Sequence, residues 1–257
     1  MEDPLFILFS VVLGACMGSF LNAVALRTVD QRPWWGSERS RCASCGKVLG
    51  PSELVPLFSW FFLKGRCRGC GAKIPWRYPL SEAVGALGAG LLAWRWGFSS
   101  AGLFALAAGS LLLLNSLTDL YSGYIYDAFA LVLGAAGIIL RLSGGKGALL
   151  DALFGALLGA GVIILIILVS RGGMGWGDAW LMAGIGAVLG WKLAAVALYL
   201  GFIVGGAVAL VLLAARVVRR KDPIPLGPFL AIGAFLSLLV GPALWGWFGY
   251  PMSWPWG

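Results

Sequence analysis

Residues 148–169 of this chain read ALLDALFGALLGAGVIILIILV, an apolar run of about the length that crosses a lipid bilayer. The whole 257-residue chain is 60 % hydrophobic and only 12 % charged, which is more apolar material than one soluble core of this length uses. Charged residues gather in a few stretches, and runs of roughly 17 to 22 apolar residues lie between them. The sequence therefore predicts an all-α polytopic membrane protein.

The length rule predicts a bundle of about eight transmembrane helices. They are expected near residues 5–26, 80–97, 101–118, 125–141, 148–169, 179–191, 193–215 and 226–248. The predicted domains are a first transmembrane helix in residues 1–26, a polar module in residues 27–79 and a transmembrane bundle in residues 80–257. The sixth span is short, and a bundle of seven spans is the alternative.

The cationic residues predict how the chain is oriented. Ten of the 19 Lys and Arg residues lie in segment 27–79, so this segment should be cytoplasmic. With alternating spans, the cationic residues that also fall inside are Arg171, Arg216, Arg219, Arg220 and Lys221. Those that fall outside are Arg95, Arg141, Lys146 and Lys192, which makes the split fifteen to four and places the N-terminus outside. This asymmetry explains the net charge of +8 without a nucleic-acid partner.

Two C-x-x-C pairs lie within the polar module, separated by 21 residues. Their cysteines are Cys42, Cys45, Cys67 and Cys70. Each pair is followed by a glycine, Gly46 or Gly71, and two such turns predict a closed tetrahedral zinc site. Because cysteine fills all four positions and no site is left for a reactive water, the zinc is expected to be structural. Two disulfides or a redox pair are the alternatives, which a reducing cytoplasm disfavours.

The chain contains no histidine, which excludes Ser-His-Asp and Cys-His mechanisms and metal sites that need imidazole. Among its eleven acidic residues, two have unusual positions. Asp119 follows an apolar run at the C-terminal end of a predicted helix, where the helix dipole disfavours a negative charge. Asp178 follows the glycine-rich segment 172–177 and opens the sixth span. With alternating spans, both aspartates lie on the cytoplasmic side.

Two carboxylates that share a site cannot both ionise cheaply, so the pair is expected to hold one proton near neutral pH. The ionised member can then activate a water molecule while the protonated member polarises a peptide carbonyl, which is the chemistry of aspartic proteolysis. The alternative is that such boundary aspartates cap helices or serve an ion or proton pathway. Glu82, Asp127 and Asp151 lie just inside predicted span starts and are expected to interact with the helix dipoles there.

Taken in order, these motifs resemble those of the type IV prepilin peptidases, membrane aspartic proteases of the Gly-x-Gly-Asp class. The resemblance covers most of the chain. The matching pieces are Gly18-Ser-Phe-Leu-Asn22 with Arg27, the double C-x-x-C module, Pro56-Leu-Phe-Ser-Trp60, Gly65-Arg66-Cys67, Arg77-Tyr-Pro-Leu-Ser-Glu82, Asp119 with Ile125 and Asp127, and Gly173-Met-Gly-Trp-Gly-Asp178.

The resemblance implies that Asp119 and Asp178 are the catalytic pair and that Gly175, Gly177 and Asp127 support the catalytic loops. The implied substrates are prepilins or pseudopilins, cut at the end of a short basic leader on the cytoplasmic side of the bacterial inner membrane. Members with the four cysteines commonly also methylate the new N-terminus with S-adenosylmethionine. The sequence does not identify the residues that bind this methyl donor, nor the oligomeric state.

Two positions depart from the family pattern. Tyr126 stands where a proline is usual, and Trp180 stands where a lysine is often found. Neither change removes a catalytic carboxylate, and both bear on substrate preference.

The competing functions are a transporter that uses the aspartates for ions and a zinc-bearing membrane scaffold. A transporter would more often show internal repeats, which the chain lacks, and a scaffold would tolerate loss of both aspartates.

Overall fold

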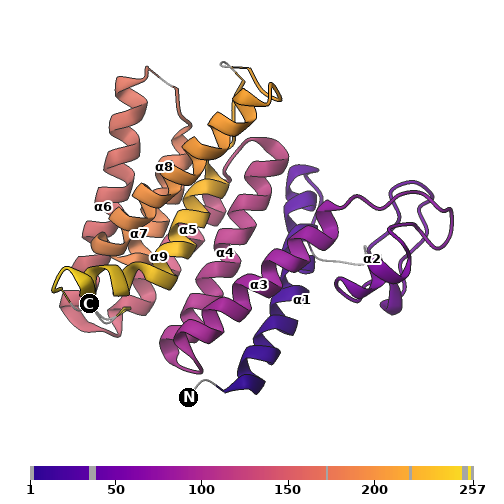
Figure 1. Ribbon diagram of the computed structural model, residues 1–257, viewed down its shortest axis with the longest axis horizontal. Helices are drawn as coiled ribbons and strands as arrows, with labels where there is room; N and C mark the ends of the chain where they lie inside the picture. The colour runs from indigo at the N-terminus through magenta and orange to yellow at the C-terminus, as the bar shows by residue number, and fades with distance from the viewer. Residues whose placement is uncertain (1–2, 35–38, 172, 220–221, 251–253, 256–257) are drawn as a thin grey trace. The chain divides into compact units, whose positions relative to one another are not determined.

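The computed structural model describes residues 3–34, 39–171, 173–219, 222–250 and 254–255, so Arg220 and Lys221 of the predicted cytoplasmic cluster lie outside the described residues. Within these ranges the regular secondary structure is helical, apart from two isolated β-bridges. The helices are α1 (Pro4–Val29), α2 (Phe58–Phe62), α3 (Arg77–Trp96), α4 (Ser100–Ser122), α5 (Asp127–Leu142), α6 (Gly145–Val169), α7 (Trp176–Leu189), α8 (Trp191–Ala214) and α9 (Gly227–Trp247), with a 3-10 turn at Pro51–Glu53 (Figure 1).

The eight predicted spans correspond in order to α1 and to α3 through α9. Five of these helices, α1, α4, α6, α8 and α9, are long and apolar enough by themselves to cross a membrane. α7 has only 14 residues, and Gly190, with φ +77°, lets the chain turn directly from α7 into α8. The structure confirms an all-α multi-pass membrane protein with about eight long helices in its described residues.

The described residues fall into two compact units, residues 1–102 and residues 103–257. The division falls close to the start of α4. The first unit contains α1, α2 and α3, and the second contains the rest of α4 and the helices that follow it. The domain boundaries predicted at residues 26 and 79 stay a prediction.

In the first unit, α1 and α3 pack closely through small residues. A Cβ on Gly14 or on Gly85 would collide with the backbone carbonyl of the other glycine. Glu82 of α3 is buried at this interface, where it accepts hydrogen bonds from Ser19 Oγ of α1 and from the backbone N–H of Leu57, both at 2.7 Å. The expectation that Glu82 interacts with its own helix dipole is wrong, because it lies beyond the first turn and connects three segments.

In the second unit, α7 is the central helix, and ten of its 14 residues are buried. Its residue Ile185 lines the same apolar space as Leu112 of α4, Leu133 of α5 and Leu238 of α9. Such an all-round apolar surface is typical of a helix with packed neighbours on every side. The position of α7 matters for function because Asp178 lies in its first turn.

At the end of this unit away from Asp178, a buried ion pair connects four helices. Arg141 Nη1 of α5 lies 2.6 Å from Asp151 Oδ2 of α6, and Arg141 Nη2 donates to the carbonyl of Val188 in α7 at 3.1 Å. The backbone N–H of Trp191, the first residue of α8, donates to Asp151 Oδ1 at 3.3 Å. Asp151 was expected to interact with the start of its own helix, but it pairs with Arg141 and with the start of α8.

Candidate active site and metal centre

Asp119 lies in the last turn of α4 and is only 3 % exposed. Its Oδ2 atom accepts a hydrogen bond from the backbone N–H of Gly227, the first residue of α9, at 2.8 Å. The positive end of α9 therefore offsets the unfavourable position of this carboxylate at the end of α4.

Gly227 itself was not among the predicted site residues. A Cβ at this position would lie 2.7 Å from Asp119 Oδ2 and 3.3 Å from Asp119 Cγ, so a side chain here would displace the carboxylate. The signal that could have found it is Gly227-Pro228 at the opening of the last apolar run, because proline favours the first turn of a helix. Its contact with Asp119, 108 residues earlier, has no signal in the sequence.

Asp178 is the third residue of α7, and it is 8 % exposed. Its Oδ2 atom accepts a hydrogen bond from the backbone N–H of Gly175, which precedes the helix, at 3.1 Å. A Cβ on Gly177 would lie 2.9 Å from the Cβ of Ile125 and 3.2 Å from its carbonyl oxygen. Gly175 therefore orients the carboxylate, and Gly177 lets the first turn of α7 lie against the segment that precedes α5.

The fold places Asp119 and Asp178, which are 59 residues apart in the sequence, at the same end of the second unit, because the start of α7 lies against Ile125 just after α4. Their carboxylates are close enough to interact electrostatically. Each is held through Oδ2, and the Oδ1 atoms have no hydrogen-bond partner among the described residues. Asp127 is exposed in the first turn of α5, where its charge faces the helix dipole, and it bonds to neither aspartate within the described part of the chain.

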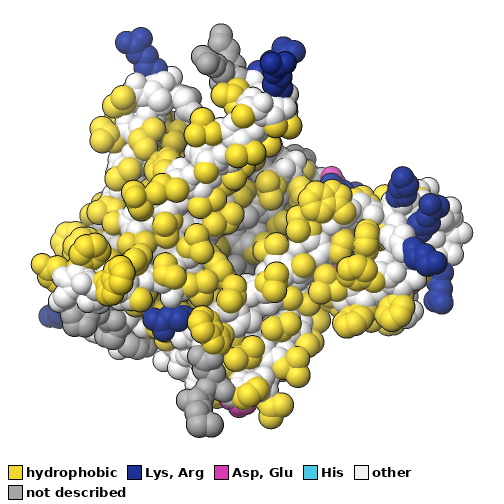
Figure 2. All heavy atoms as spheres, in the orientation of Figure 1, with side chains coloured by type: hydrophobic (Ala, Val, Ile, Leu, Met, Phe, Trp, Pro, Cys, Tyr) yellow, Lys and Arg dark blue, Asp and Glu magenta, His cyan; other side chains and the backbone are white. Residues whose placement is uncertain are grey.

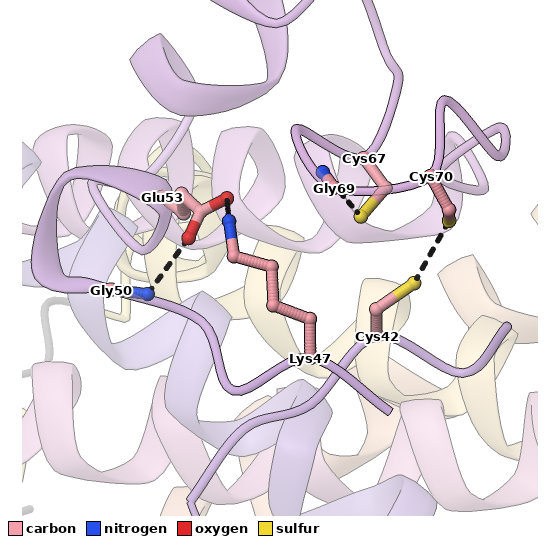
Figure 3. Close-up of polar contacts among 7 residues, drawn as sticks. All are labelled: Cys42, Lys47, Gly50, Glu53, Cys67, Gly69 and Cys70. Atoms are coloured by element: carbon pink, nitrogen blue, oxygen red, sulfur yellow. Dashed lines mark hydrogen bonds and ion pairs between the residues drawn. The ribbon is translucent and has the colours of Figure 1, made fainter. Parts of the chain in front are cut away.

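The four cysteines meet in the module between α1 and α3. Their Sγ atoms all lie within 4.8 Å of one another, and the Sγ atoms of Cys42 and Cys70 are 3.9 Å apart. Figure 3 shows three of the four, Cys42, Cys67 and Cys70. A tetrahedral zinc ion with Zn–S distances of about 2.3 Å requires sulfur atoms about 3.8 Å apart, so the cluster fits a four-coordinate ion after small side-chain adjustments. These cysteines are therefore positioned to bind a metal ion.

The two C-x-x-C turns have the same backbone geometry. The N–H of Gly46 donates to the carbonyl of Cys42, and the N–H of Gly71 donates to the carbonyl of Cys67, both at 2.9 Å. Both glycines have positive φ values, +70° and +71°, which strain residues with a Cβ. The repeated geometry aims both pairs of thiols at one centre.

Backbone N–H groups favour the thiolate form of Cys42. Hydrogen bonds from the N–H of Cys45 and of Ser44 lower the pKa of the Cys42 thiol to about 6, which favours the thiolate that a metal needs. Beside the cluster, Lys47 Nζ lies 3.0 Å from Glu53 Oε1, and Gly50 N–H donates to Glu53 Oε2 at 2.9 Å (Figure 3). Glu53 thus stabilises the loop that follows the first pair of cysteines.

Comparison with known proteins assigns both parts of the chain. Residues 12–96 match the bacterial peptidase A24 N-terminal domain, and residues 106–210 match the type IV leader peptidase family. A prepilin leader peptidase/N-methyltransferase of Stutzerimonas stutzeri is 34 % identical over 93 % of each chain. The chain belongs to the type IV leader peptidase family. It is therefore a peptidase.

Further relatives of this leader peptidase carry the same description. Proteins named prepilin leader peptidase/N-methyltransferase from Burkholderia pseudomallei and Pseudomonas aeruginosa are each 36 % identical to it. They align over 91 % and 92 % of this chain and over 85 % and 91 % of their own lengths, respectively. No solved structure matches this leader peptidase. The two matched segments lie in separate structural units, with the cysteines in the first and the aspartate pair in the second.

Proposed function

We propose that this leader peptidase is an aspartic endopeptidase that uses Asp119 and Asp178 to remove the leader of type IV prepilins or pseudopilins. The observation that carries the proposal is that two buried carboxylates lie close enough to interact electrostatically, each held by a single backbone N–H through one oxygen. The names of its relatives supply the substrate class. By the distribution of cationic residues, cleavage takes place at the cytoplasmic face of the bacterial inner membrane.

The pair works with one shared proton. The ionised carboxylate takes a proton from a water molecule, and the resulting hydroxide attacks the carbonyl carbon of the peptide bond. The protonated carboxyl group donates a hydrogen bond to the carbonyl oxygen, and a proton then passes to the leaving amine as the carbon–nitrogen bond breaks. No covalent bond to the enzyme forms. The Oδ1 atoms are the groups free for these steps, because both Oδ2 atoms are held by the backbone.

The proposal includes two further parts. Zinc is the metal that Cys42, Cys45, Cys67 and Cys70 bind, and its role is to hold the module together, since four thiolates leave no coordination position for a substrate. The second part is methylation of the N-terminus that cleavage exposes. S-adenosylmethionine supplies the methyl group in that reaction, and the relatives' names are its support.

The decisive experiment compares purified full-length variants on a pilin precursor. Asp119→Asn and Asp178→Asn should each lower the cleavage rate by several orders of magnitude, as expected for groups that act as a unit. Both variants should fold, because an asparagine oxygen can still accept the hydrogen bond from Gly227 or Gly175. The comparison variant is Asp127→Asn, which should lower cleavage much less, since the interaction of this residue with its helix dipole is worth only about 0.3–1 kcal/mol.

Full cleavage by either catalytic variant would exclude the aspartic mechanism.

The same variants test the methylation proposal when they receive a pilin that has already been cut. Methyl transfer should survive there, because moving a methyl group from a sulfonium donor does not require an aspartate pair. Loss of methylation in folded Asp178→Asn protein would show that the two reactions share this residue.

A further inference from the structure

Three phenylalanines on α2 form an exposed aromatic face on the cysteine module. Phe58, Phe61 and Phe62 are 64 %, 67 % and 82 % exposed. Trp60 lies on the other side of this short helix, where its Nε1–H donates to the carbonyl of Ile74 at 3.3 Å. Trp60 thus fixes one side of α2 against the module, and the Phe61 ring meets the Trp60 ring edge-on at a centroid distance of 5.5 Å while staying largely exposed. Such a cluster of exposed rings on a folded domain is typical of a contact surface.

Glu82 sets the depth at which this aromatic face lies. The backbone N–H of Leu57, the residue just before α2, donates to the buried carboxylate of Glu82 at 2.7 Å. Glu82 is five residues beyond the start of α3, which corresponds to about 7.5 Å along the helix axis. α2 therefore begins beside the second turn of α3. For α3 as one of the eight predicted spans, this turn is expected near the boundary between lipid headgroups and acyl chains.

The charges around the aromatic face fit the same medium. Residues 39–76 contain seven cationic residues and one acidic residue, Glu53, which is paired with Lys47. Lys64, two residues after α2, and Arg66 are both exposed. Figure 2 shows hydrophobic side chains continuing from the α1–α3 pair onto this module, with Lys and Arg side chains projecting from its outer edge. Apolar rings with cations beside them match the surface of an anionic membrane.

We infer that α2 is an interfacial membrane anchor: Phe58, Phe61 and Phe62 insert into the leaflet beside α3, and the neighbouring cations contact lipid phosphates. The partner is the bilayer itself. In this arrangement the hydrogen bond between Leu57 and Glu82 fixes the depth of insertion. The metal-binding module then lies on the membrane surface and is not held only by its chain connections to α1 and α3. The inference does not depend on the catalytic assignment.

Site-specific photo-crosslinking of the full chain in lipid nanodiscs containing phosphatidylglycerol tests this inference. The photoreactive residue p-benzoylphenylalanine replaces Phe62 in one variant and Arg68 in a second. Arg68 is the matched control, since it is exposed in the same module but lies in the second cysteine turn. Leu8, exposed on the apolar helix α1, is the positive control for lipid contact. Metal content and thermal stability of each variant confirm that the module is folded.

Mass spectrometry of the products gives the answer. The probe at position 62 should yield at least about ten-fold more lipid adduct than the probe at position 68, approaching the yield at position 8, because inserted apolar side chains lie among acyl chains. Equal lipid yields at positions 62 and 68 would overturn the inference. A protein adduct in place of lipid at position 62, whether to the second unit or to another copy, would overturn it as well.

Discussion

At the scale of single residues, the position of the Asp119 carboxylate depends on a glycine of another helix. Gly227→Ala adds a methyl group 2.7 Å from Asp119 Oδ2, so the carboxylate has to move. We expect the cleavage rate of a pilin precursor to fall by roughly 10²-fold, since misplacing a catalytic group by about 1 Å can have an effect of that size.

The matched control for this variant is Gly206→Ala in α8, where a Cβ has no neighbour within 4 Å. It should cleave like the unmodified protein. Thermal stability of both variants separates a local displacement from unfolding. Unchanged cleavage by Gly227→Ala would mean that the contact between α9 and Asp119 does not position the carboxylate.

At the scale of elements, the metal should decide whether the module between α1 and α3 folds. Removing zinc with a chelator, or replacing Cys67 with serine, should unfold residues 39–76, because structural zinc typically contributes about 10–16 kcal/mol to the folding of such small modules. Hydrogen exchange should show this loss of protection there and little change in α4 through α9. Metal analysis should find about one zinc per chain.

Two results would contradict the zinc prediction: protein that folds correctly without zinc, or a module that stays protected after the metal is removed. Cys16 provides the control, because it lies in α1 and does not belong to the metal-binding group. Cys16→Ser should retain both the metal and the protection of the module.

The contact between α6 and α7 is a second prediction at this scale. A Cβ on Gly155 would collide with the carbonyl of Gly186, so the two helix backbones are in direct contact. Gly155→Val should separate the helices, shift the start of α7 with Asp178, and destabilise the bundle by about 1–3 kcal/mol or more. Both thermal stability and cleavage should fall.

Gly161→Val on the same helix is the control for this contact. A Cβ at Gly161 has no neighbour within 4 Å, so the variant carries the same unfavourable helix propensity of valine without the collision. Equal losses for the two variants would assign the effect to helix propensity rather than to packing.

At the scale of the whole molecule, the fifteen-to-four distribution of cationic residues predicts the orientation in the membrane. An impermeant thiol reagent added to intact cells should label Lys146→Cys, in the first turn of α6 on the outside, and should leave Arg216→Cys unlabelled. Both positions are exposed in the structure. A Cys16→Ala background removes the one native cysteine outside the metal-binding group. Labelling at position 216 but not at position 146 would show that the protein has the opposite orientation in the membrane.

The sequence by itself determined the class of fold, the spans and the cysteine cluster, because each depends on local properties. Span positions follow from runs of apolar residues, and two C-x-x-C turns followed by glycine specify the geometry of their own thiols. Asp119 and Asp178 could be singled out by their positions at helix ends and by the family resemblance. Gly175 and Gly177 could also be singled out from the local sequence, because they lie in the glycine-rich segment before Asp178. The contact between Gly177 and Ile125 could not be predicted in this way.

Only the tertiary structure decided what these residues contact. The sequence places Asp119 at an unfavourable helix end, but the fold brings Gly227 of α9 to it and offsets that cost. Glu82 and Asp151 were assigned to their own helices, whereas they bond to Leu57 and Arg141. The physical reason is that buried polar groups in apolar surroundings take partners from whichever segment packs beside them, and that segment is chosen by the packing of distant helices.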